Sequence, residues 1–205
     1  MTIVAEAPYE VNDTTPDSQV VSIKAAGADV LVNIATPKFA AQVIRKVAEL
    51  SWKPLHIVNN VGASVGAVLR PAGLDNSTGV LTAGYLKDST DPTLKDDPEF
   101  QEWSAFMDKY YPEGDKANGS SVSGYGLAQT LVHVLKMAGD ELTRENIMKQ
   151  AINLKNLRIK MVRPGILVNT SPTDYYPLEQ LQMLRFNGNN WQTIGEVLSG
   201  EIGGS

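Results

Sequence analysis

Few residues in this sequence have the type and spacing that catalysis or metal binding requires. The chain of 205 residues has no cysteine and two histidines, His56 and His133. Each histidine stands alone in an apolar stretch, whereas a metal site draws its ligands from clustered His, Cys, Asp or Glu side chains. The run Ser123-Gly124-Tyr125-Gly126 lacks the central serine of a nucleophile elbow. We therefore expect a protein that is not an enzyme and that holds no metal and no other cofactor.

One turn keeps an enzymatic alternative open. The segment Asn59-Asn60-Val61-Gly62 resembles the Asn-Asn-Ala-Gly turn of short-chain dehydrogenases. That interpretation requires a glycine-rich turn after the first strand, where this chain has Pro8-Tyr9-Glu10-Val11. It also requires a Tyr-x-x-x-Lys pair, and Lys116 follows Tyr111 one residue too late. A doubly wound enzyme of this kind stays as an alternative, and the turn is interpreted first as a polar loop.

The composition indicates a globular protein and argues against several partners. The chain is 42% hydrophobic and 20% charged, with a formal net charge of −5, which is typical of a folded domain. No run of Lys and Arg forms a basic patch, so we expect no nucleic-acid partner. No apolar run is long enough to span a membrane, and Met1–Glu6 lacks the basic and apolar regions of a signal peptide.

Hydrophobic periodicity predicts that strands and helices alternate over residues 1–87. The predicted strands are Thr2–Ala7, Asp29–Ile34, Pro54–Val58 and Gly79–Tyr85, and the helices between them are Asp17–Ala26, Pro37–Leu50 and Ser64–Leu69. This order indicates an α/β fold with a parallel sheet, flanking helices and right-handed crossovers. Later in the chain, Glu99–Tyr111 and Ser121–Ala138 predict helices. The pair Asn187-Gly188 between apolar runs predicts a hairpin.

The loops after parallel strands meet at one edge of a sheet, where ligands bind in this fold class. Taken singly, these loop residues have ordinary roles, with Thr36 as a helix cap and Gly62 as a turn residue. Taken together, they predict a ligand site. The candidate residues are Ala35, Thr36, Asn60, Val61, Gly62 and Tyr85, with Tyr9 beside them.

The order of several segments is similar to a known family. These segments are Ala28–Phe39, Ala41–Leu50, Gly79–Tyr85 and Gly124–Leu131, followed by Asn169–Pro177 and Gln182–Gly188. Together they resemble the second half of a type 1 periplasmic solute-binding protein, the branched-chain amino-acid receptor kind of ABC importer. The resemblance extends over essentially the whole chain.

This resemblance implies a truncated receptor with two α/β lobes that close over a solute. Residues 1–113 and 177–205 would form the second lobe, and residues 114–176 part of the first. The leading half of the first lobe would be missing, so the chain would hold half a binding site. The resemblance further implies a periplasmic location, a small-molecule solute and a membrane permease as partner. A ligand-sensing regulatory domain on the same fold is a further alternative.

The resemblance also bears on the solute. Amino-acid receptors of this family commonly present an aromatic residue and an acid where this chain has Ala35 and Val61. A buried ammonium group without a carboxylate partner is costly. We therefore expect an aromatic or other organic acid in preference to a branched-chain amino acid, with apolar contact from Val61 and polar contacts from Thr36 and Asn60.

The predicted sheet starts abruptly at Thr2, which indicates a piece of a longer chain. A parallel sheet without its neighbouring elements exposes an apolar face and an unpaired edge. Leaving a few hundred Å² of apolar surface in water costs several kcal/mol at roughly 25 cal/mol per Å². We therefore expect a homodimer, through strand exchange or edge pairing, that covers this surface.

Overall fold

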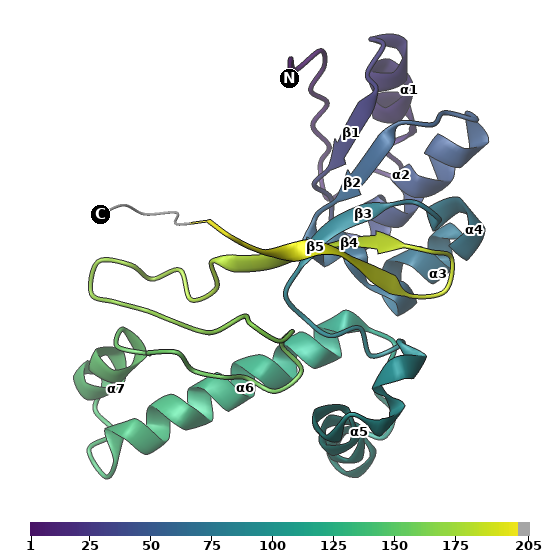
Figure 1. Cartoon of the computed structure of the whole chain (residues 1–205). Coiled ribbons are helices and arrows are strands. Elements are labelled where there is room, and N and C mark those ends of the chain that lie inside the picture. The colour runs from purple at the N-terminus through teal and green to yellow at the C-terminus, as the bar shows by residue number, and fades with distance from the viewer. Residues whose placement is uncertain (201–205) are drawn as a thin grey trace. The chain divides into compact units, whose positions relative to one another are not determined.

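The structure is a computed structural model that describes residues 1–200 (Figure 1). The helices are α1 (Asp17–Ala25), α2 (Pro37–Glu49), α3 (Arg70–Ala72), α4 (Leu74–Ser77), α5 (Pro98–Tyr110), α6 (Gly119–Ala138) and α7 (Arg144–Ala151). The strands are β1 (Val30–Asn33), β2 (Leu55–Val58), β3 (Leu81–Gly84), β4 (Gln180–Phe186) and β5 (Trp191–Ser199). Three short helical turns are η1 (Asn60–Ala63), η2 (Val65–Leu69) and η3 (Pro92–Asp96).

The chain divides into two compact units. The first unit contains Met1–Gly84, Ala117–Gly119 and Leu184–Ile194. The second contains Tyr85–Lys116, Ser120–Met183 and the described residues that follow Ile194. The predicted division into lobes, with boundaries near residues 113 and 177, concerns the two-lobed receptor that the resemblance implies. It stays a prediction.

One five-stranded sheet has the order β1-β2-β3-β4-β5. β1 and β2 are parallel, with Asn33 opposite Val58, and β2 and β3 are parallel, with Val58 opposite Thr82. The α/β fold with a parallel-rich sheet and flanking helices is therefore confirmed. Helices connect these strands, as parallel pairing requires.

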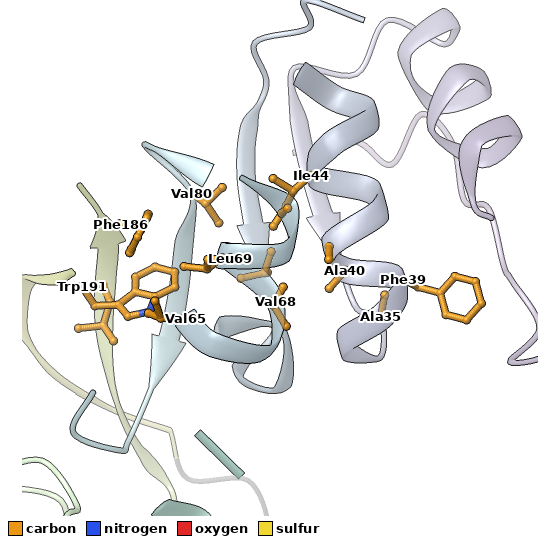
Figure 2. Close-up of a cluster of buried hydrophobic side chains, with 14 residues drawn as sticks. Ala35, Phe39, Ala40, Ile44, Val65, Val68, Leu69, Val80, Phe186 and Trp191 are labelled. Carbon is orange, nitrogen blue, oxygen red and sulfur yellow. The ribbon is translucent and has the colours of Figure 1, made fainter. Parts of the chain in front are cut away.

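The core of the first unit lies between the sheet and α2. Helix α2 begins with Pro37 in its first turn and buries a stripe that includes Phe39, Ala40 and Ile44. Figure 2 shows these side chains in one cluster with side chains from η2 and from the β4–β5 hairpin, including Trp191. The apolar stripe of α2 was readable from the sequence because its helical spacing is regular.

Two predicted elements of the first unit are different in the structure. Thr2–Ala7 is not a strand, although its residues favour one, because no neighbouring strand pairs with it and an unpaired strand has no backbone hydrogen bonds to hold it. The predicted helix Ser64–Leu69 is a π-helical turn, Val65–Leu69, and the Ser64 side chain accepts a hydrogen bond from Ala67 N at 3.2 Å.

The hairpin prediction is confirmed. β4 and β5 are joined by a tight turn in which Asn187 N donates to Asn190 O at 3.1 Å. The Asn187 side chain accepts from the backbone N–H groups of Asn189 and Asn190, each at 2.9 Å. Gly188 has a φ of +98°, a conformation that glycine adopts without steric cost.

The second unit packs α5, α6 and α7 around two apolar clusters. One cluster centres on the fully buried Trp103 of α5, and the other includes Val134 of α6. Asp97 caps α5 by accepting from Glu99 N at 2.8 Å, and Thr143 caps α7. The helices predicted at Glu99–Tyr111 and Ser121–Ala138 correspond to α5 and α6.

Candidate functional site

The candidate site of the first unit begins at the carboxyl ends of β1 and β2. Asn33 and Val58, the last residues of these strands, are opposite each other in the parallel register. Asn59 N also donates to Asn33 O at 3.0 Å, which continues the pairing one residue past β2. The loops that carry Ala35–Thr36 and Asn60–Gly62 therefore leave the sheet at the same edge, as the sequence predicted.

The loop after β1 is fixed by Tyr9. Thr36 N donates a hydrogen bond to Tyr9 Oη at 2.8 Å, and the rings of Tyr9 and Phe39 have centroids 4.5 Å apart. Ala35 is buried beneath this contact, whereas Thr36 is exposed. Thr36 occupies the N-cap position of α2, as predicted, but its side chain makes no capping hydrogen bond. The tyrosine hydroxyl instead accepts from the Thr36 amide and donates to the exposed Thr36 Oγ1 at 3.5 Å.

The loop after β2 is a tight turn that presents Asn60 and Val61. The Asn59 side chain accepts from Gly62 N at 2.9 Å, and η1 follows. A Cβ atom on Gly62 would lie 3.0 Å from Asn59 Oδ1 and 3.3 Å from Ala40 Cβ. A side chain at this position would therefore press on Asn59 and on Ala40 of α2, which glycine avoids. The turn leaves Val61 57% exposed and Asn60 partly exposed.

A buried polar layer lies under these loops, and sequence analysis did not assign it a role. Asn33 Nδ2 and His56 Nε2 are 3.4 Å apart, and Thr82 donates to Val58 O at 3.0 Å. Burial lowers the pKa of His56 to about 4, so the imidazole is neutral at physiological pH. The amide Nδ2 is only a donor, so His56 Nε2 must be the acceptor. Buried and accessible side chains alternate along β1 and β2. This alternation was the sequence signal that could have placed Asn33 and His56 on the buried face.

The chemistry available at this edge is hydrogen bonding and apolar contact. Neither Ile34–Thr36 nor Asn59–Ala63 contains an acidic or basic side chain. In residues 1–200, no group of three or more His, Cys, Asp or Glu side chains is arranged to hold a metal ion. The edge thus offers a hydroxyl, an amide and an isopropyl group to a ligand.

Tyr85, the remaining predicted site residue, is the first residue of the second unit. Its partly buried side chain packs against the cluster that contains Val134, and its carbonyl oxygen accepts from Arg163 N at 2.8 Å. The structure therefore brings together Ala35, Thr36 and the Asn60–Gly62 turn at one sheet edge, and Tyr85 is described with the other unit. Their role in ligand binding stays a prediction.

The family model described as periplasmic binding protein matches residues 1–174, so the chain belongs to this family. The predicted resemblance to the binding proteins of ABC importers is thereby confirmed. A comparison with curated proteins gave no match. Within the part of the chain that the structure describes, no helix is both long and apolar enough to cross a lipid bilayer.

Solved structures share the fold. One is a branched-chain amino acid ABC transporter protein from Thermus thermophilus with bound valine, with a TM-score of 0.76 at 16% identity; the match covers 93% of this chain and 51% of that one. An extracellular ligand-binding receptor from Rhodopseudomonas palustris HaA2 has a TM-score of 0.65 at 22% identity, over 89% and 52% of the chains.

A fatty acid ABC transporter substrate-binding protein from Thermomonospora curvata has a TM-score of 0.64 at 18% identity, over 95% of this chain and 49% of its own. The chain thus spans about half the length of these structures. At identities below 25%, these likenesses establish the fold.

Proposed function

We propose that this chain is part of a solute-binding receptor of an ABC importer and that its solute contacts the loops after β1 and β2. The observation that carries the proposal is the parallel register that ends both strands at one edge, where Thr36, Asn60 and Val61 are accessible. Ligands of open α/β sheets bind at the carboxyl ends of the strands. Membership of the periplasmic binding protein family supports binding without catalysis.

The solute is a small organic acid, aromatic or aliphatic, in preference to an amino acid. An α-ammonium group taken out of water needs an anionic or hydrogen-bonding partner. The two loops contain no carboxylate, and the position that resembles the acid-bearing one of amino-acid receptors is the apolar Val61. The solved relatives are described with bound valine and as a fatty acid transporter protein, so the fold accommodates both classes.

The receptor acts in the periplasm with a membrane permease as its partner. Solute binding shifts the population of receptor conformations toward the one that the permease recognises. The family membership of the chain supports this location and this partner.

A residue-resolved titration tests the proposal on the chain itself. ¹⁵N-labelled protein is titrated with benzoate, with a medium-chain fatty acid and with leucine, and the backbone amide shifts are followed. The acids are expected to move the amides of Thr36, Asn60, Val61 and Gly62, and leucine is expected to move them less. Shifts with leucine alone would overturn the proposed solute class, and the absence of shifts at these loops with all three ligands would overturn the site.

A further inference from the structure

The turn after β2 is held at its far end by a tryptophan of the β4–β5 hairpin. Trp191 Nε1 donates a hydrogen bond to Ala63 O at 2.9 Å, across 128 positions of the sequence. Ala63 is the last residue of η1. The carbonyl groups at the end of a helical turn have no donor within that turn. The indole therefore supplies a donor that the turn itself lacks.

The near end of the same turn is fixed locally. Asn59 Oδ1 and Asn59 O both accept from Gly62 N, at 2.9 and 3.0 Å. Asn60 and Val61 lie between the two anchors, and among residues 1–200 no hydrogen bond joins either of them to another segment. The two ends of the turn therefore set the position of these accessible residues, and one of those ends depends on the hairpin.

Trp191 is itself held in place by packing. It is 5% exposed, and its ring centroid lies 5.4 Å from that of Phe186 in an edge-on arrangement. Figure 2 shows it in one cluster with Val65 of η2. Trp191 is the first residue of β5 and directly follows the turn that the Asn187 side chain closes. A buried, close-packed side chain keeps one rotamer, so the direction of its N–H group is fixed.

We infer that Trp191 is a positioning residue of the solute site, whose indole N–H holds the turn so that Asn60 and Val61 face the solute. The inference rests on the proposed function, because it concerns the same solute and the same loop. A buried indole hydrogen bond can also serve stability alone. The two roles differ in their consequences: loss of a stabilising bond affects the whole unit, whereas loss of a positioning bond affects the turn and the affinity for the solute.

Trp191→Phe removes the N–H group and keeps an aromatic ring beside Phe186. Hydrogen exchange is followed at the Gly62 amide in the turn and at the Leu55 amide, which donates to Asp29 O at 2.8 Å at the other end of β2. In Trp191→Phe we expect exchange at Gly62 to accelerate about two- to tenfold more than exchange at Leu55, as the loss of one net hydrogen bond allows. A general loss of stability would accelerate both amides equally.

Solute affinity is the second measurement. Benzoate and octanoate are titrated into each protein, and the backbone amide shifts of Asn60 and Val61 give the dissociation constants. Both acids should bind Trp191→Phe about two- to tenfold more weakly than the parent chain. The matched control is Trp103→Phe, which replaces a fully buried tryptophan whose Nε1 has no hydrogen-bond partner among the described residues. This control should leave both the affinity and the exchange ratio unchanged.

Other results would overturn the inference. Parent-like affinity in Trp191→Phe, or equal acceleration of exchange at Gly62 and Leu55, would leave the indole a stabilising role only. A parent chain whose turn amides respond to neither acid would overturn the proposed function, and the exchange ratio would still decide whether Trp191 holds the turn. If Trp191→Phe does not fold, the indole N–H resonance of Trp191 is followed in the parent chain. It should shift with benzoate together with the Val61 amide, and an indole resonance that stays constant while that amide shifts would overturn the inference.

Discussion

Replacing His56 tests whether the buried polar layer makes the stability of the protein depend on pH. Burial lowers the pKa of His56 to about 4 in the folded chain, against an ordinary value of about 6.5 in the unfolded chain. Below about pH 6.5 the unfolded chain therefore binds a proton that the folded chain does not. Stability is thus lost as the pH falls through 6.5, and the loss is complete near pH 4.

The size of the effect follows from this difference in pKa. At 1.36 kcal/mol per unit, the full loss is about 3 kcal/mol, of which about 2 kcal/mol falls between pH 7 and 5. The cause is burial, which withdraws water from the protonated imidazole; the neighbouring Asn33 Nδ2, 3.4 Å from His56 Nε2, is itself a donor and offers that proton no acceptor.

Urea unfolding at pH 7 and at pH 5 measures the effect. In His56→Gln, the free energy of unfolding should fall by about 2 kcal/mol less between the two pH values than in the parent chain. His133→Gln, the matched control on α6, should lose as much stability as the parent. An equal loss in the parent chain and in His56→Gln would refute the assignment of a buried neutral imidazole.

Four further substitutions test the sheet-edge loop, the packing around two glycines and one group of ion pairs. Val61→Asp supplies a carboxylate at the sheet edge and should strengthen binding of amino acids relative to organic acids in a calorimetric titration; an unchanged preference would contradict the solute proposal. Gly66→Ala places a Cβ atom 2.6 Å from Ala117 O and should lower the free energy of unfolding by about 1–3 kcal/mol, whereas Gly124→Ala, with open space around it, should raise it by about 0.5–1 kcal/mol. Lys87→Met removes the ammonium group that lies 2.6 and 2.7 Å from two carboxylates. It should lower the free energy of unfolding, measured in urea, by about 1–3 kcal/mol. A midpoint equal to that of the parent would show that these ion pairs contribute nothing to stability.

Local patterns determined several elements. The apolar stripe of α2 and the Pro37 at its start specify a helix wherever the stripe finds a partner. Asn187-Gly188 specifies a tight turn through glycine's access to positive φ, and the structure has the hairpin there. The alternation of short strands with helices indicated the parallel sheet, because parallel neighbours need crossover connections.

Other features depend on which segments meet in space, and no local pattern contains that information. Thr2–Ala7 has the composition of a strand, but a strand exists only with a hydrogen-bonded neighbour, and among residues 1–200 no strand pairs with this segment. Tyr9 reaches the Thr36 amide across 27 positions, and Asn33 meets His56 across 23. The sequence alone thus determined most of the helices, the paired strands and the edge at which the loops gather. Tertiary contacts decided whether Thr2–Ala7 pairs and how the loops are held, because burial and long-range hydrogen bonds depend on the whole packed unit.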